Sequence, residues 1–214
     1  MFIDHDPYEN WADEYDSQSL KCQWHSPAIL FGLMYYRLSP GESLLDLGIG
    51  TGLGALPFHK AGLKVLGIDR SPAMIDRCRR RNLPWKIIQH DLTHSPWPIE
   101  NNSVDHVISA GVTHFVGDLR VFVFEASRVM KAGGLFGFDF HEFVREENQE
   151  YSVLEDGIYQ RYDAEYSQHF FRHTETYVLD ILSASGFKVI HDTEFLASRE
   201  PKRFFRVIVS QLAN

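Results

Sequence analysis

The stretch LLDLGIGTGLGALPFHKAGLKVLGID, residues 44–69, decides the fold. Its first apolar run predicts a buried strand, and four glycines follow at every second position over residues 48–54. We predict a helix over residues 51–61, in which Pro57 must either bend the helix or mark a late start. The second apolar run, residues 64–69, predicts another strand. This order of strand, helix and strand indicates a right-handed crossover between two parallel strands.

The rest of the chain continues the alternation and then changes rhythm. Three further apolar runs, WKIIQHD, SVDHVISAG and GGLFGFDF, predict strands, and helices are expected over residues 72–81 and 118–130. Near the end, residues 188–198 and 203–212 form two β segments separated by a short polar turn, which predicts an antiparallel hairpin. We therefore expect an α/β fold with a doubly wound, mostly parallel sheet that ends in this hairpin.

Helix starts can be predicted from residues that cap a helix. Ser26 and Ser71 each stand before a proline, and Thr174 precedes an apolar helical segment, so all three are predicted N-caps. Between the sheet and the last helix, GIYQRYDAEYSQHFFRH alternates with aromatic residues and predicts either a hairpin or a lid.

The composition limits the possible functions. The chain has 214 residues, of which 44% are hydrophobic, and this favours one domain with a substantial core. A net charge of −8 argues against nucleic acid as a partner. No apolar run approaches the roughly 18 residues of a membrane span, so no membrane partner is expected. We assign the one basic cluster to a solvated helix face: Arg77, Arg79, Arg80 and Arg81.

Location and metal content are inferred from the start of the chain and from its cysteines and histidines. The first residues, MFIDHDPYEN, lack a basic segment followed by an apolar core, so we expect no signal peptide. Cys22 and Cys78 fit reduced thiols, which favours a cytoplasmic location. Eleven histidines occur without a CxxC or HExxH spacing, and no metal site is expected. The oligomeric state stays open.

The glycine loop predicts the chemistry of a ligand. Glycine permits positive φ and lets a ligand approach backbone N–H groups, while the following helix start attracts an anionic group. Phosphate and carboxylate both remain open at this point. Asp69 ends the next strand 21 residues after Gly48, the distance at which a Rossmann acid accepts hydrogen bonds from ribose hydroxyls. The alternative role of Asp69 is to cap the helix that follows.

Asp46 separates two classes of ribose-bearing ligand. The dinucleotide pattern GxGxxG fails when it starts at Gly48, because its third glycine falls on Leu53. When it starts at Gly50, the third position is Ala55, a variant that the pattern tolerates, but a single match of this kind is weak evidence. A carboxylate at Asp46, two residues before the loop, would repel a pyrophosphate but can accept a hydrogen bond from an ammonium group. The pattern therefore favours an adenosylated amino acid over a dinucleotide.

The chain resembles a known family through five motifs that occur in the family's order: LLDLGIGTG, VLGIDRSPAMI, IIQHDL, NSVDHVISAGVTHFVGDL and RVMKAGGLFGFDF. Over roughly residues 25–210 they resemble the class I S-adenosylmethionine-dependent methyltransferases. The resemblance implies a seven-stranded Rossmann-like sheet and S-adenosylmethionine as cofactor. The tail is similar to an uncharacterised subgroup that acts on small molecules, but the subgroup's segment before the last helix is matched only in part by FFRHT. Arg172 and His173 are therefore given no catalytic role.

The resemblance also implies a role for each matched residue. Asp46 and the glycines Gly48, Gly50 and Gly52 match the family's first motif, hhDhGxGxG. Gly48, Gly50 and Thr51 are expected beside the methionine moiety, and Asp69 on the ribose. Residues expected around the adenine and along the cofactor towards the acceptor are Ser71, Met74, Asp91, Leu92, Ala110 and Gly111.

The acceptor side is predicted from position in the fold. His114 follows the fourth strand and His141 the fifth, at the carboxyl edge where open α/β sheets bind ligands, so both are candidate catalytic bases. Trp11 and Tyr15 are candidates to cover the sulfonium. We expect a single methyltransferase domain over residues 1–214. Within it, residues 1–40 would form an arm and helix that cover the cofactor, and residues 140–173 a substrate-side insertion.

Methyl transfer to a small molecule or a protein side chain is the favoured function, and two alternatives remain. One is a catalytically silent module that binds S-adenosylmethionine or S-adenosylhomocysteine. The other is an NAD-dependent oxidoreductase, whose usual Tyr-x-x-x-Lys pair is not formed by Tyr35, Tyr151 or Tyr162. The NPPY signature of nucleic-acid base methylases is missing too, since the fourth strand leads into SAGVTHF.

Overall fold

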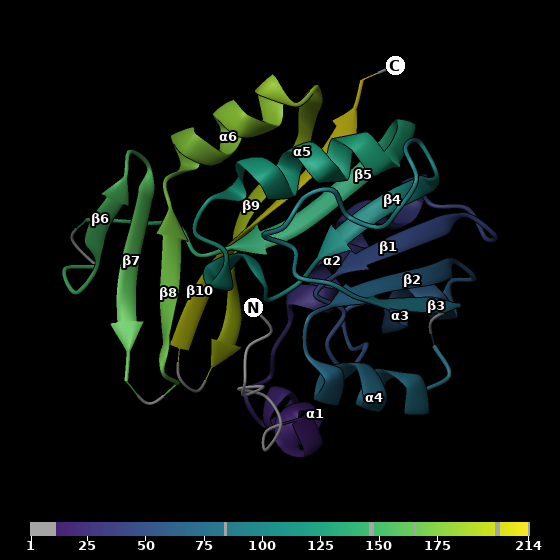
Figure 1. Ribbon diagram of the computed structural model, residues 1–214, viewed down its shortest axis with the longest axis horizontal. Helices are drawn as coiled ribbons and strands as arrows, with labels where there is room; N and C mark the ends of the chain where they lie inside the picture. Colours follow the sequence, from purple (N-terminus) through teal and green to yellow (C-terminus); the bar gives the residue numbers. More distant parts are fainter. Residues whose placement is uncertain (1–11, 84, 146–147, 165, 200–201, 214) are drawn as a thin grey trace.

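A computed structural model gives the fold, and it describes residues 12–83, 85–145, 148–164, 166–199 and 202–213. Seven strands form the main sheet in the order β3-β2-β1-β4-β5-β10-β9 (Figure 1). Its parallel part consists of β1 (Ser43–Leu47), β2 (Lys64–Asp69), β3 (Lys86–Gln89), β4 (Val104–Ser109) and β5 (Met130–Phe140). β10 (Lys202–Leu212) runs antiparallel to both β5 and β9 (Phe187–Arg199). The predicted mostly parallel, seven-stranded sheet with its antiparallel hairpin is confirmed.

Helices cover both faces of this sheet (Figure 1). One face packs against α2 (Ser26–Met34), α3 (Leu56–Lys60) and α4 (Pro72–Arg80), and the other against α5 (Leu119–Val129) and α6 (Glu175–Ala184). Side chains of β1 alternate between the two cores: Leu45 and Leu47 join the α5 side, and Leu44 joins the α2 side. Within the described ranges, no helix is both long and apolar enough to cross a membrane.

Two predicted N-caps are confirmed and one is wrong. The hydroxyl oxygens of Ser71 and Thr174 accept hydrogen bonds from the N–H groups of Met74 and Tyr177. In α2, however, the N-cap is His25, because the first helical hydrogen bonds already end on the His25 carbonyl; Ser26 is the first residue of the helix. The late-start alternative for the helix over residues 51–61 holds, since α3 begins only at Leu56.

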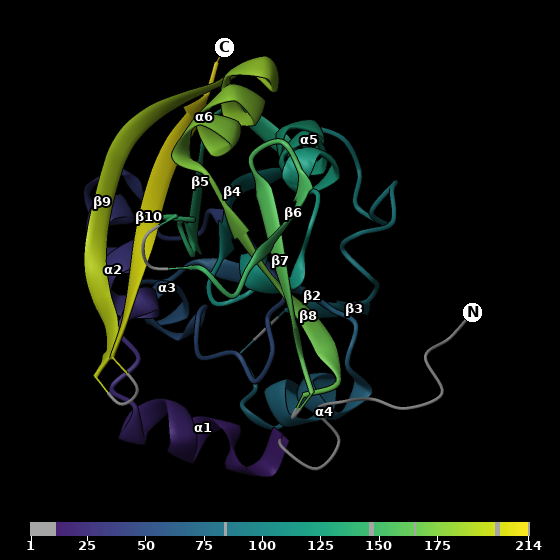
Figure 2. The same cartoon turned by 90° about the vertical axis from the view of Figure 1, so that its left-hand side faces the viewer.

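A small second sheet stands beside the carboxyl edge of the main one (Figure 2). It consists of β6 (Ser152–Glu155), β7 (Ile158–Asp163) and β8 (Gln168–His173), all antiparallel to their neighbours. The hairpin alternative for GIYQRYDAEYSQHFFRH is thus confirmed. The His173 ring nitrogen Nε2 lies 2.8 Å from the Gly117 carbonyl, which ties β8 to the loop after β4. Burial lowers the pKa of His173 to about 4, so the ring donates as a neutral imidazole.

Candidate cofactor and acceptor site

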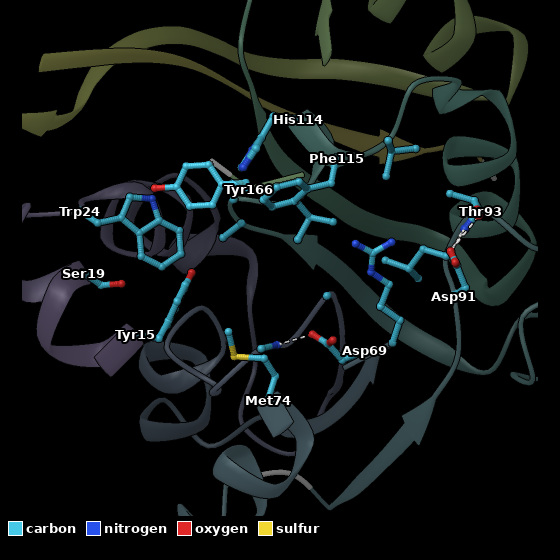
Figure 3. A pocket seen from close by; sticks show the side chains of 18 of the residues that line it. Tyr15, Ser19, Trp24, Asp69, Met74, Asp91, Thr93, His114, Phe115 and Tyr166 are labelled. Carbon is cyan, nitrogen blue, oxygen red and sulfur yellow. Dashed lines mark hydrogen bonds between the residues drawn. The ribbon is translucent and has the colours of Figure 1, made fainter. Parts of the chain in front are cut away.

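A pocket of about 350 Å³ opens at the carboxyl ends of β1, β2 and β4, where the strand order reverses. This is the place where open α/β sheets bind ligands, and the volume lies in the range of small-molecule sites. Asp91 and Thr93 stand at one end of the pocket, while Trp24, Tyr166 and His114 gather at the other (Figure 3). Eight predicted cofactor residues line it: Gly48, Gly50, Asp69, Met74, Asp91, Leu92, Ala110 and Gly111.

The glycine loop forms the floor of the pocket because its backbone adopts conformations that other residues avoid. Gly48 and Gly50 have φ values of 72° and 52°. A Cβ on Gly48 would lie 2.5 Å from a methyl group of Val112, so the loop after β4 can pack against this position only when it is glycine. The two loops thus meet directly under the ligand space.

Asp46 is a buried carboxyl group beneath this loop. Its side chain is 2% exposed, and its Oδ2 has no hydrogen-bond partner among the described residues. Burial, and then the nearby Asp69 carboxylate, raise the pKa of Asp46 to about 8. Gly54 leaves room for the group, since a Cβ there would stand 3.2 Å from Asp46 Oδ2. Asp46 and Thr51 line a small side pocket of about 20 Å³ that shares Gly48 and Gly50 with the larger one. The orphaned oxygen suits a cationic ligand group.

Asp69 joins the glycine loop to the start of α4. Its Oδ2 accepts from the Gly50 N–H at 2.7 Å (Figure 3). Its Oδ1 accepts from the Ser71 N–H at 2.9 Å. The side chain lies on the pocket wall and is only partly buried. The bond to the Ser71 N–H fits the helix-capping role that was the alternative to ribose binding. The carboxylate still lies on the pocket wall, where it could also accept a hydrogen bond from a ribose hydroxyl.

Asp91 and Leu92 define the end of the pocket near β3. Asp91 Oδ1 accepts from both the N–H and the hydroxyl of Thr93. Burial alone would raise the pKa of Asp91, but these hydrogen bonds and the positive charge of Arg70 hold it below the ordinary value. Asp91 is therefore an ionised acceptor that faces the pocket. Met74, from the first turn of α4, supplies an apolar side chain to the pocket wall.

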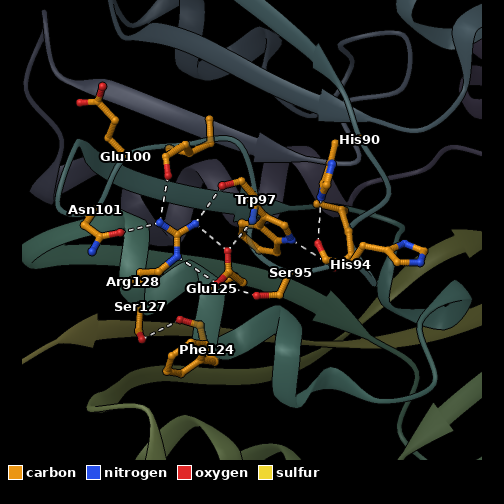
Figure 4. A network of polar contacts seen from close by, with 12 residues as sticks. His90, His94, Ser95, Trp97, Glu100, Asn101, Phe124, Glu125, Ser127 and Arg128 are labelled. Carbon is orange, nitrogen blue, oxygen red and sulfur yellow. Dashed lines mark hydrogen bonds and ion pairs between the residues drawn. The ribbon is translucent and has the colours of Figure 1, made fainter.

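A polar network fixes the loop that follows Asp91 and Leu92 (Figure 4). Trp97 Nε1 donates to the Leu92 carbonyl at 3.1 Å, and the Trp97 N–H donates to Glu125 Oε2 at 2.7 Å. Arg128 pairs with Glu125 at 2.6 Å and donates to the carbonyls of Trp97 and Ile99. Because Glu125 is 1% exposed, α5 holds this loop from within the core.

Two predicted cofactor residues lie behind the pocket wall, and a third serves another contact. Gly52 packs against α4, where a Cβ would meet Cys78 Sγ at 3.0 Å, and Ser71 is occupied as the cap of that helix. The Thr51 hydroxyl donates to Asp16 Oδ1 at 2.6 Å. These residues shape the site from behind or from the side.

The helix α1 (Ala12–Lys21) is fastened over the pocket by charge. Asp16 pairs with Arg81 and Asp13 with Arg77, both on the helix α4 or at its end. Tyr15 lies on the pocket wall, whereas Trp11, the other aromatic predicted to cover the site, falls outside the described residues. The assignment of the whole basic cluster to a solvated face is therefore wrong for Arg77 and Arg81, because they bind the acidic face of α1.

The two predicted bases differ in their access to the pocket. His114, in the short η2 helix (Thr113–Phe115), lines it. His141 is not on the wall; its ring centroid stands 5.4 Å from that of His114 and 3.9 Å from that of Phe205. The loop that carries His114 is held from below, where the buried Asp139 accepts from the Gly111 N–H at 2.7 Å. Burial raises the pKa of Asp139 to about 6.

Several wall residues were not predicted from the sequence. They are Gln18, Ser19, Cys22, Trp24, Arg70, His90, Thr93, Val112, Phe115, Val116, Tyr166 and Phe205. Tyr166 lies in the turn between β7 and β8, and Phe205 in β10, far from the glycine loop in sequence. The aromatic alternation of the β7–β8 segment was the available signal for Tyr166; nothing in the pattern of β10 distinguishes Phe205 from a core residue.

Comparison with known proteins agrees with this geometry. A family model described as a methyltransferase domain matches residues 45–138, which include β2, β3 and β4 and most of β1 and β5. Residues 45–138 are therefore similar to a methyltransferase domain, in line with the resemblance carried by the sequence motifs. The demethylmenaquinone methyltransferase of Tropheryma whipplei is 33% identical over 102 residues, or 45% of this chain and 41% of that protein. The chain thus spans less than half the length of this curated relative.

Solved structures extend the likeness of the methyltransferase fold to nearly the full chain. A Haloferax volcanii protein, solved in complex with a methyltransferase activator, has a TM-score of 0.76 and 18% identity; 98% of this chain and 97% of that chain are covered. A Methanosarcina mazei methyltransferase has a TM-score of 0.70 and 19% identity, with 85% and 97% covered. At these identities the likeness concerns the fold.

Proposed function

We propose that this protein transfers a methyl group from S-adenosylmethionine to a small molecule. The observation that carries the proposal is the orphaned Oδ2 of Asp46, buried under a glycine loop, together with Asp69 on the pocket wall. An amino acid ammonium group would supply the missing hydrogen bond and the positive charge that returns Asp46 to its ionised form. The named activity of the Tropheryma whipplei relative, a demethylmenaquinone methyltransferase, supports the same reaction class.

The residues of the pocket fit the parts of this cofactor. Asp46 would hold the ammonium group, the backbone of Gly48 and Gly50 would border the methionine part, and Asp69 would accept from the ribose. Met74 would pack on the adenine, and Asp91 with Leu92 would meet its amino edge. When bound, the cofactor supplies a methyl group on positively charged sulfur; the acceptor's electron pair forms the new bond to carbon, and the pair of the broken S–C bond stays on sulfur.

The chain's own contribution to the reaction is alignment and exclusion of water. α1 lines the pocket with Tyr15 and Gln18, and the β7–β8 turn lines it with Tyr166, so both would exclude solvent around the reacting atoms. His114 stands on the wall at the acceptor end and can take a proton if the nucleophile carries one. His141, one layer behind, would support the His114 ring through their edge-to-face contact.

We infer that residues 1–214 act as one methyltransferase domain, in which residues 1–40 cover the cofactor and residues 140–173 are a substrate-side insertion. The aromatic side chains around the acceptor end favour a small molecule over a protein side chain. A cytoplasmic location belongs to the same proposal, on the basis of two cysteines that are both free thiols.

Calorimetric titration with S-adenosylmethionine, S-adenosylhomocysteine and NAD tests the proposed cofactor. We expect both sulfur compounds to bind and NAD to give no saturable heat, because NAD has no amino acid ammonium group for Asp46 and its pyrophosphate would meet the Asp69 carboxylate. Asp69→Ala should weaken S-adenosylhomocysteine by roughly tenfold or more, while Asp180→Ala, an exposed position on α6, should leave the affinity unchanged. Tight NAD binding without a response to S-adenosylhomocysteine would exclude the proposal.

A further inference from the structure

The end of the pocket away from Asp91 identifies a class of acceptor. We propose that it takes a planar aromatic molecule without a fixed charge, whose hydroxyl or ring N–H group gives its proton to His114. The inference rests on the proposed methyltransferase function and names the acceptor for the same site. It is carried by the shape and the charge of this end of the pocket and by the His114 imidazole on its wall.

Aromatic side chains from separate parts of the chain converge on this end. Trp24 comes from the segment after α1, Phe115 from η2, Tyr166 from the β7–β8 turn and Phe205 from β10. Figure 3 shows Trp24, Tyr166 and Phe115 around one space, with His114 beside them. Ring faces and edges contact another flat ring over a large area at little cost in side-chain entropy, whereas an aliphatic chain contacts them less well.

The charges of the pocket lie elsewhere. Of the described lining residues, those with a permanent charge at neutral pH are Asp69, Arg70 and Asp91, all at the cofactor end. The guanidinium of Arg161 stands 6.0 Å from the centre of the Phe170 ring, but it pairs with Asp163 within the same hairpin. Among the described lining residues at this end, no permanently charged side chain offers a counter-ion to a carboxylate or ammonium that loses its water here, which disfavours acceptors with a fixed charge.

The imidazole of His114 is held in place by its neighbours. Its ring stacks on Phe170 with centroids 5.8 Å apart and 10° between the planes, and it contacts Phe115 at 4.0 Å. Phe170 lies in β8, so the small sheet fixes the ring that faces the pocket. In the transfer step, the acceptor's O–H or N–H proton would pass to His114 as the oxygen or nitrogen forms its bond to the methyl carbon, and His114 would then release it to water.

A fluorescence titration of 7-hydroxycoumarin into the protein saturated with S-adenosylhomocysteine tests this acceptor class. We expect binding at least about tenfold tighter than that of 7-hydroxycoumarin-3-carboxylate, which has the same rings and an added charge. Cyclohexanol, a hydroxyl compound without a flat ring, should compete only at about tenfold higher concentration or more. Equal or tighter binding of either comparison compound would overturn the proposal.

Variants of the aromatic wall residues test whether 7-hydroxycoumarin binds at this end of the pocket. Tyr166→Leu and Phe115→Leu should each weaken the coumarin by roughly fivefold and leave S-adenosylhomocysteine affinity within about twofold. Tyr36→Leu is the matched control, because Tyr36 is 94% exposed on η1 (Tyr35–Arg37). Tyr166 lies in a turn, so its replacement keeps the test valid even if Phe115→Leu folds poorly. Unchanged coumarin affinity in Tyr166→Leu would contradict the inference.

The proton acceptor has its own spectroscopic signature. Bound 7-hydroxycoumarin should show the absorption band of its phenolate at pH 7 more strongly than the free compound, and His114→Gln should keep the binding but lose the band. A band that persists in His114→Gln would exclude His114 as the acceptor of the proton. Failure of S-adenosylhomocysteine to bind would reject the proposed function itself, whereas its binding without coumarin preference would reject only the acceptor class.

Discussion

A single buried carboxyl group links stability and function at the residue scale. Asp46 lies under the glycine loop with an orphaned oxygen, and its pKa is raised to about 8 by burial and by Asp69. Its ordinary pKa is 3.8, so the folded protein holds a proton that the unfolded chain releases. The ligand-free protein should therefore lose stability as the pH rises from about 4 to about 8. Under the proposed function, a cationic ligand group would reverse this cost.

Asp46→Asn separates the effect of Asp46 on stability from its effect on ligand binding. The amide cannot ionise, so the free energy of unfolding of the ligand-free variant should exceed that of the wild type by at least about 1 kcal/mol at pH 8 and should match it more closely at pH 5. Urea denaturation at both pH values measures this. Affinity for S-adenosylhomocysteine should fall by roughly tenfold or more. Asp180→Asn, exposed on α6, serves as the control; equal pH dependence in Asp46→Asn and wild type would refute the account of Asp46.

At the scale of elements, α1 and α5 each hold one end of the pocket. α1 is fastened by Asp16, which accepts from Thr51 of the glycine loop and pairs with Arg81 beyond α4. α5 holds the loop after Asp91 through Glu125 and Arg128. The two contacts differ in burial: the side chains of Asp16 and Arg81 are 26% exposed, while Glu125 is 1% exposed. We therefore expect α1 to affect ligand release and α5 to affect stability.

Asp16→Asn should speed the release of bound cofactor. The change keeps the size of the side chain but removes the charge that holds Arg81, so α1 should open more often. Stopped-flow displacement of bound S-adenosylhomocysteine should show a dissociation rate roughly threefold to tenfold higher than in the wild type. Glu14→Gln, on the exposed side of the same helix, should show the wild-type rate. Identical rates in Asp16→Asn and Glu14→Gln would rule out α1 as a gate.

Glu125→Gln should weaken the fold. Its carboxylate accepts from Trp97 and Ser95 and pairs with Arg128, so the amide leaves Arg128 without its counter-charge. We expect a loss of roughly 2 kcal/mol in the free energy of unfolding by urea denaturation at pH 7. Burial alone would raise the pKa of Glu125, but the hydrogen bond from Arg128 and the other contacts lower it, so the stabilisation should disappear as the pH falls below the ordinary value of 4.5. Glu100→Gln, an exposed acid in the same loop region, should cost little; a comparable loss there would contradict this assignment.

At the scale of the whole molecule, the sheet and the cofactor end could be predicted because local sequence determines them. Apolar runs define the parallel strands, and parallel strands place their carboxyl ends at one edge, so Asp46, Asp69 and Asp91 meet there without further information. The acceptor end depends on packing between distant segments. Tyr166 and Phe205 reach the pocket only because the β6–β8 sheet and the terminal hairpin fold back against the loop of His114.

Two sequence interpretations were incorrect: the solvated face assigned to the arginine cluster and the N-cap of α2. Neither feature is determined by the local residue pattern alone. Arg77 and Arg81 were assigned to solvent because a helix pattern shows which face is polar but does not show what covers it; α1 covers it here. The cap of α2 was placed one residue late, because Ser26 has the right chemistry while the chain path starts the helical bonds at His25. The first error concerns a contact between segments and the second the local path of the backbone, and residue patterns encode neither.

The central claim is that this pocket binds an adenosyl amino acid through Asp46. The most direct test is calorimetric titration with S-adenosylhomocysteine at pH 7, carried out in two buffers that differ in ionisation enthalpy. Because Asp46 is mostly protonated before binding and must ionise to hold the ammonium group, binding should be saturable and should release a proton to the buffer. The observed enthalpy should then depend on the buffer in the wild type and lose most of that dependence in Asp46→Asn. Absence of binding, or an enthalpy that is the same in both buffers, would contradict the account.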